Sequence, residues 1–147
     1  MARKRLLVVE DYQQLRDLIA TVLREVGGYA AETAAESKSA ERLIVEQPFD
    51  LVVLDLGMPG ALGGPGIARL ARRRLGCPIL FITGRDLAQT DPDLMQPGDR
   101  FLRKPFKMDV LLAEVAALMK ADVPKALKSS KRSPVRSSRS KIKSAQA

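Results

Sequence analysis

The chain has 147 residues, the length of one globular domain, with 46% hydrophobic residues, a formal net charge of +8 and no histidine. The lack of histidine excludes Ser–His and Cys–His catalytic pairs, a histidine-based metal site and a histidine phosphodonor. Cys77 is the single cysteine, which excludes an intrachain disulfide and is typical of a reducing compartment, so we expect a cytoplasmic protein.

Apolar stretches are too short for a membrane protein. None approaches the roughly 20 residues of a membrane span. The four apolar residues after Arg5 are also fewer than the about 7–15 of a signal peptide. We therefore expect no membrane insertion.

Short apolar runs alternate with amphipathic stretches along the chain, which predicts alternating strands and helices. In chain order we expect a strand at 5–10, a helix with its apolar face from Leu15 to Val26, a weak strand at 29–33, a helix at 37–46, a strand at 51–55, a helix from Ile67 to Leu75, strands at 78–82 and 100–103, and a helix from Met108. Glycines Gly27, Gly28 and Gly76 end helices, and Ser37 is a possible N-cap.

Residues 85–99, RDLAQTDPDLMQPGD, fit this alternation poorly. They contain Pro92 and Pro97 and lack a clear apolar stripe, and a proline inside a helix is unfavourable by about 3 kcal/mol. We therefore expect the fourth helix to be short or irregular. The order of elements as a whole predicts an α/β fold with a five-stranded parallel sheet and helices on both faces.

The charge is concentrated at the C-terminal end. Residues 1–119 hold 16 basic and 16 acidic residues, whereas residues 120–147 hold nine basic residues and one acid. The second segment has few large apolar residues, so we expect a folded domain over 1–119 and a disordered basic tail over 120–147. The tail is interpreted either as a solubilising extension or as a nonspecific contact with nucleic acid.

Acidic side chains come at the ends of two predicted strands. Glu10 and Asp11 follow the first apolar run, and Asp55 ends the run LVVLD. Since the carboxyl ends of parallel strands meet at one edge of a sheet, these acids should converge there with Thr83 and Lys104. Mg²⁺ prefers oxygen ligands, so Asp11 and Asp55 could bind it directly and Glu10 through water.

A carboxylate beside Mg²⁺ can act as a nucleophile toward phosphorus and form an aspartyl phosphate. Lys104 would supply a positive charge to the transferring group, Thr83 a hydroxyl, and Gly84 a backbone N–H. Taken singly, the acids have simpler interpretations as helix or turn caps. Their joint placement at strand ends favours the functional interpretation.

Four segments in a fixed order carry a family resemblance: LLVVED (6–11), LVVLDLGMPG (51–60), FITG (81–84) and FLRKPF (101–106). Over roughly residues 5–119 the chain resembles the receiver domain of two-component response regulators. The resemblance implies a flavodoxin-like fold with strand order 2-1-3-4-5. It also implies a subgroup with a reduced fourth helix, and we expect no folded output domain within residues 120–147.

The resemblance also implies roles for individual residues. Asp55 corresponds to the phosphoacceptor, Glu10 and Asp11 to the metal-binding pair, and the backbone carbonyl of Gly57 to a further Mg²⁺ ligand. Three more positions match the switch hydroxyl, the phosphate-binding lysine and the aromatic residue that changes rotamer: Thr83, Lys104 and Phe101. Phe101 has no hydroxyl, which excludes a hydrogen-bonded inward or outward position for this side chain.

We therefore expect a signalling switch, not an enzyme, that accepts a phosphoryl group on Asp55 from a histidine kinase or phosphotransfer protein. The reaction would require Mg²⁺ and change contacts with an output protein that the sequence does not identify, with a homodimer as one possibility. The alternative is a receiver-like module that no longer signals and whose basic tail binds nucleic acid. A phosphatase on the same fold ranks last, because the sequence offers no additional base.

Overall fold

The computed structural model describes residues 3–84 and 93–120. Its elements, in chain order, are β1 (Arg5–Val9), α1 (Gln13–Glu25), β2 (Ala30–Ala34), α2 (Ser37–Glu46), β3 (Leu51–Asp55), α3 (Gly63–Leu75), β4 (Ile79–Thr83), β5 (Arg100–Arg103) and α4 (Met108–Lys120). Each predicted strand is present within one residue of its expected bounds. Neither described stretch contains a helix long and apolar enough to cross a membrane.

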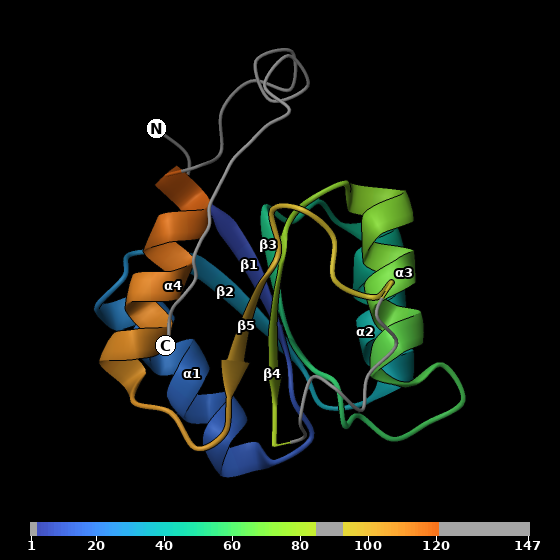
Figure 1. Cartoon of the computed structure of the whole chain (residues 1–147), viewed down its shortest axis with the longest axis horizontal. Coiled ribbons are helices and arrows are strands. Elements are labelled where there is room, and N and C mark those ends of the chain that lie inside the picture. The colour runs from blue at the N-terminus through green and yellow to red at the C-terminus, as the bar shows by residue number, and fades with distance from the viewer. Residues whose placement is uncertain (1–2, 85–92, 121–147) are drawn as a thin grey trace.

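The five strands form one sheet in the order β2-β1-β3-β4-β5, and every neighbouring pair is parallel (Figure 1). Helices α1 and α4 lie on one face of the sheet, and α2 and α3 lie on the other. The predicted fold class and strand order are therefore confirmed. In this doubly wound arrangement, the carboxyl ends of β1 and β3 lie side by side.

Alternating side chains on each strand build the two halves of the core. On β1, Leu6 and Val8 pack toward α1 and α4, while Leu7 and Val9 pack toward α2 and α3. Strands β3 and β4 are buried along their whole length, as expected for inner strands of a sheet covered on both faces. The edge strand β5 begins and ends with exposed arginines, Arg100 and Arg103.

The connection between β4 and β5 contains turns over residues 93–99, and the rest of the predicted fourth helix, residues 85–92, lies outside the described residues. Asp99 fixes this connection: its carboxylate accepts the N–H groups of Ile79 and Gln96 at 2.9 Å each and pairs with Arg72. Leu94 is 2% exposed and joins the core beside α3. Buried contacts at Leu94 and Asp99 thus hold the described part of the segment in place.

The start of α2 differs from the expectation. The N-cap position belongs to Glu36, so the prediction that Ser37 caps the helix is wrong. The buried Ser37 hydroxyl instead donates to the carbonyl oxygen of Pro59 at 2.7 Å. Gly60 follows with φ +114°, and a Cβ on Gly60 would lie 2.7 Å from the Ser37 oxygen. The loop after β3 therefore rests directly against the start of α2.

Candidate metal centre

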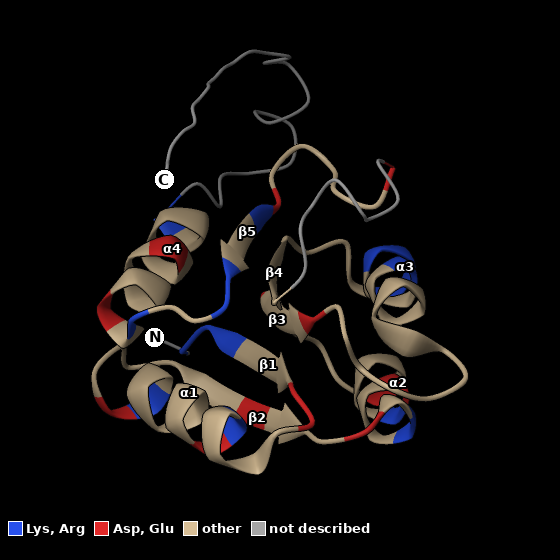
Figure 2. Cartoon of the chain, turned by 60° about the horizontal axis from the view of Figure 1, so that its bottom comes forward, with Lys and Arg blue, Asp and Glu red and all other residues tan. Residues whose placement is uncertain are grey.

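The acidic residues lie where β1 and β3 end. Glu10 directly follows β1, and its N–H donates to the carbonyl oxygen of Ala34 at 3.1 Å. Asp55 is the last residue of β3. Figure 2 shows acidic residues, in red, at the carboxyl ends of these two adjacent strands. Two chain segments far apart in the sequence are thereby brought to one edge of the sheet.

Carboxylate oxygens of Glu10, Asp11 and Asp55 lie within 4.8 Å of one another. Glu10 and Asp55 are buried, whereas Asp11 is exposed. Three like charges this close repel one another, and a divalent cation between them would relieve that repulsion. The cluster therefore has the donor type and spacing that a hard cation such as Mg²⁺ requires.

Glu10 is the most shielded member of the cluster, with no exposed surface. Its Oε2 accepts the N–H of Tyr12 at 3.0 Å. Among the described residues, Oε1 accepts no hydrogen bond of good geometry, although it lies 2.9 Å from Nζ of Lys104 as an ion pair. Burial raises the pKa of Glu10 above 4.5, and the contacts with Lys104 and Tyr12 oppose the shift only in part. Oε1 thus has coordinating capacity left for a metal or a metal-bound water.

Lys104 bridges the two buried acids. Its Nζ lies 2.9 Å from Glu10 and 3.2 Å from Oδ2 of Asp55. Burial alone would lower the pKa of Lys104, but the close contact with Glu10 and the charge of Asp55 outweigh burial and raise it. The lysine is therefore a fixed positive charge beside the carboxylate expected to react.

The Asp55 carboxylate is oriented from its own loop as well as by Lys104. Its Oδ1 accepts the N–H of Gly57 at 2.9 Å. A Cβ on Gly57 would lie 3.4 Å from that oxygen, so the backbone passes close to the carboxylate. These two contacts hold one oxygen toward the loop and the other toward Lys104.

The other predicted site residues lie on β4 and β5. Thr83, 1% exposed, ends β4, and its carbonyl oxygen accepts the N–H of Lys104 at 2.8 Å. Gly84 follows, and a Cβ there would meet no heavy atom within 4 Å. Phe101 pairs with Phe81 across the sheet and is partly buried against the core beside α2 and α3. The ends of β4 and β5 thus lie next to the acids.

The sequence reasoning missed two side-chain contacts near the site, those of Arg16 and Ser37. Nη1 of Arg16 donates to the carbonyl oxygens of Glu10 and Asp11, at 3.1 and 3.4 Å. Ser37 holds the loop after β3 through Pro59. The only sequence signal for Arg16 was its position five residues after the acidic pair, which alone does not distinguish it from a surface arginine.

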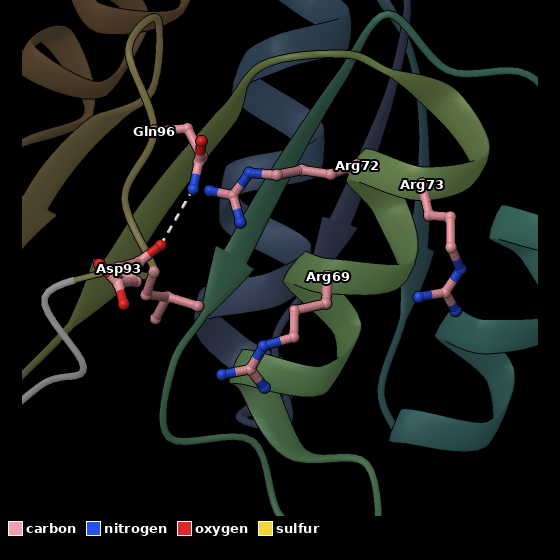
Figure 3. A pocket seen from close by; sticks show the side chains of 6 residues that line it. Arg69, Arg72, Arg73, Asp93 and Gln96 are labelled. Carbon is pink, nitrogen blue, oxygen red and sulfur yellow. Dashed lines mark hydrogen bonds between the residues drawn. The ribbon is translucent and has the colours of Figure 1, made fainter.

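A separate hollow of about 380 Å³ lies on α3 and does not include the acidic cluster. Figure 3 shows Arg69, Arg72 and Gln96 around it, together with Asp93. Arg72 is occupied here, because it pairs with Asp99 and lies over the Phe81 ring at 5.8 Å. This hollow is therefore separate from the acidic cluster at the ends of β1 and β3.

Comparison with known proteins agrees with this geometry. The model of the response regulator receiver domain matches residues 6–116. The chain is 39% identical over 116 residues to the transcriptional regulatory protein TcrA of Mycobacterium tuberculosis and 36% identical over 124 residues to the response regulator protein PmrA of Pseudomonas aeruginosa. These matches cover 78% and 84% of this chain but 45% and 56% of those proteins. The chain thus spans about half the length of the curated relatives it matches.

Solved structures show the same fold. The response regulator TrrA of Thermotoga maritima, in complex with Mg²⁺–BeF, superposes with a TM-score of 0.68 at 30% identity, over 78% of this chain and 98% of TrrA. A response regulator receiver protein of Sinorhizobium medicae gives a TM-score of 0.74 at 23% identity, over 81% and 96% of the two chains, which shows the fold alone.

The parallel sheet and the acidic edge define a flavodoxin-like α/β protein with a site suited to a divalent cation. The chain belongs to the response regulator receiver domain family, the signalling domains of two-component systems. Receiver domains of this family interact with histidine kinases and output domains.

Proposed function

We propose that Asp55 accepts a phosphoryl group from the phosphohistidine of a partner histidine kinase or phosphotransfer protein, in a Mg²⁺-dependent reaction. The observation that carries this proposal is the placement of the Asp55 carboxylate. It lies in one cluster with Glu10 and Asp11 and 3.2 Å from Nζ of Lys104. A nucleophile, oxygen ligands for a cation and a fixed positive charge are thereby combined at one strand end.

In this proposal Glu10, Asp11, Asp55 and the backbone carbonyl of Gly57 hold Mg²⁺. When bound, the ion neutralises charge on the phosphoryl oxygens. Two observations support the assignment: Oε1 of Glu10 lies in an ion pair with Lys104 but accepts no hydrogen bond of good geometry among the described residues, and the similar TrrA structure is a complex with Mg²⁺–BeF. Lys104 and the N–H of Gly84 supply the remaining positive charge and hydrogen-bond donor.

The reaction is a simple displacement at phosphorus. A carboxylate oxygen of Asp55 forms the new P–O bond as the P–N bond to the donor imidazole breaks, and the electron pair returns to that nitrogen. Later attack by water on the phosphorus releases phosphate and restores the carboxylate. The chain catalyses only these steps on itself, so we class it as a switch and not as an enzyme acting on other substrates.

Phosphorylation would then change the surface near β4 and β5. Thr83 moves its hydroxyl toward the phosphoryl group and Phe101 repacks, which shifts a pre-existing equilibrium between two conformations. Phe101 is partly buried on the edge strand β5, where it packs against the core, and this is the side chain that we propose changes rotamer. The output is a change in protein–protein contacts, and we propose that it takes place in the cytoplasm.

The test uses acetyl phosphate as donor, with and without Mg²⁺, and intact-mass measurement of the full chain. Wild type should gain one phosphoryl group only with Mg²⁺, and Asp55→Asn should gain none. Asp17→Asn is the matched control, because Asp17 is an exposed carboxylate on α1. A mass gain in Asp55→Asn equal to that of wild type would reject the proposal.

The basic tail supports a second, separate proposal. Residues 121–147 lie outside the described residues, so contact with nucleic acid stays a prediction based on the charge excess in the sequence. Binding of the full chain to duplex DNA should weaken steeply with salt, because basic residues that contact phosphates release counterions. A truncation after Lys120 should abolish this binding but keep phosphorylation. DNA binding that survives the truncation would reject the tail's role.

A further inference from the structure

Arg16 in the first turn of α1 reaches back over the loop that carries the acidic pair. Its Nη1 donates to the carbonyl oxygen of Glu10 at 3.1 Å and, more weakly, to that of Asp11 at 3.4 Å. The backbone N–H of Arg16 donates to the carbonyl oxygen of Tyr12 at 2.9 Å. One half-buried residue therefore contacts the carbonyl oxygens of three successive residues between β1 and α1.

The direction of the two carboxylates depends on the orientation of those peptide groups. The N–H of Glu10 continues the strand ladder to the carbonyl oxygen of Ala34, but the carbonyl oxygens of Glu10 and Asp11 lie past the last residue of β1 and before α1. A charged guanidinium binds carbonyl oxygens more strongly than a neutral donor does, and its planar shape fixes direction as well as distance. Arg16 thus ties the acidic pair to the rigid helix.

We propose that Arg16 is a positioning residue that sets the Mg²⁺ affinity of the cluster by holding the backbone of Glu10 and Asp11. The inference rests on the proposed function, because it requires that the cluster bind Mg²⁺. Arg16 acts through the carbonyl groups and touches neither the ion nor the phosphoryl group.

The positive charge of Arg16 also repels a bound cation, and this repulsion opposes the positioning effect. The two effects can be separated by experiment. Repulsion would make Mg²⁺ binding tighter once the charge is removed, whereas loss of positioning would make it weaker. Arg16 is partly exposed, so salt and water screen its repulsion. The positioning effect depends on direct hydrogen bonds and is screened less, so it should dominate.

The experiment measures the Mg²⁺ dissociation constant of the full chain by calorimetry, and the melting temperature in EDTA, for wild type, Arg16→Lys and Arg16→Gln. Arg16→Lys keeps the charge but loses the planar donor group. The matched control is Arg24→Lys. Arg24 lies in the last turn of the same helix, and its Nε and Nη2 donate to the carbonyl oxygen of Ala31 at 3.0 and 2.7 Å, away from the acids.

Both Arg16 variants should raise the dissociation constant about tenfold, as is typical when a group that orients metal ligands is removed. Arg24→Lys should leave it within about twofold, although its melting temperature in EDTA falls at least as far. An unchanged constant in Arg16→Lys, tighter binding in Arg16→Gln, or an equal loss in Arg24→Lys would each overturn the inference. If wild type itself binds no Mg²⁺, the proposed function falls too, which separates that failure from a failure of the Arg16 inference alone.

Discussion

The ammonium group of Lys104 lies 2.9 Å from Oε1 of Glu10, a carboxylate with no exposed surface. The same ammonium lies 3.2 Å from Asp55. Both acids are proposed Mg²⁺ ligands, so one lysine and one cation would draw on the same oxygens. Without a cation, Lys104 is the group that balances the charge of the buried acids. This arrangement links the stability of the fold to the state of the site.

Replacing Lys104 with methionine should therefore destabilise the protein in EDTA. Removing one partner of a buried ion pair leaves the other charge uncompensated, at about 3–5 kcal/mol when both are fully buried. The Lys104 side chain is 27% exposed, so we expect a smaller loss of about 1–3 kcal/mol in the free energy of unfolding. Urea titration measures it, with the exposed Lys107→Met as control. Equal stability of the two variants would contradict the prediction.

Glu10 should make the stability of the metal-free protein depend on pH. Because burial holds the pKa of Glu10 above 4.5, the folded protein binds this proton more tightly than the unfolded chain does. The resulting stability is fully present below pH 4.5 and is lost as the pH rises through the folded pKa.

The free energy of unfolding of wild type minus that of Glu10→Gln should consequently fall as the pH rises above 4.5 in EDTA. Urea titrations between pH 4 and 7 give this difference, with the exposed Glu41→Gln as the matched control variant. A difference that is flat over the range, or that grows with pH, would mean that burial does not raise the pKa of Glu10.

The sequence was sufficient to predict the sheet and the edge at which three acidic residues meet. Apolar runs of four or five residues mark β1, β3 and β4, whereas β2 and β5 have weaker patterns. The alternation of strands with amphipathic segments predicts parallel pairing. Acids at the ends of two such runs must then meet at one edge, whatever the details of the side chains. The sequence therefore predicted that Glu10, Asp11 and Asp55 lie at the same edge of the sheet.

The contacts that orient the acids were not predictable. Arg16 donates to backbone carbonyls through its side chain, and Ser37 donates to Pro59 instead of capping its own helix. Both contacts depend on the rotamer of one side chain and on the path of a loop, which is the adjacent loop for Arg16 and the loop after β3 for Ser37. Hydrophobic periodicity carries no information about either contact, because it identifies the buried face of a helix and not the partners of its polar side chains.

Cys77 should behave as an unreactive thiol in the folded protein. Burial raises its pKa from 9.0 to about 12, so very little thiolate exists at pH 8. Alkylation by iodoacetamide at pH 8 should be at least about tenfold slower in the native protein than in urea. Equal alkylation rates in the native and the urea-unfolded protein would refute the shift. The same shift means that the stability contributed by the Cys77 thiol is present below pH 9.0 and is lost as the pH rises toward about 12.

Gly64 should be the glycine of α3 that least tolerates a side chain. A Cβ at this position would lie 2.5 Å from the carbonyl oxygen of Leu56, the residue after Asp55, and that backbone atom has no side-chain freedom to move away. Gly64→Ala should reduce the free energy of unfolding by about 1–3 kcal/mol and slow phosphorylation by displacing the loop beside Asp55. Gly84→Ala, where nothing lies within 4 Å of the added carbon, should change stability by no more than about 0.5 kcal/mol. Urea titration compares the two, and a tolerated Gly64→Ala would show that α3 and β3 are not packed as closely as this contact requires.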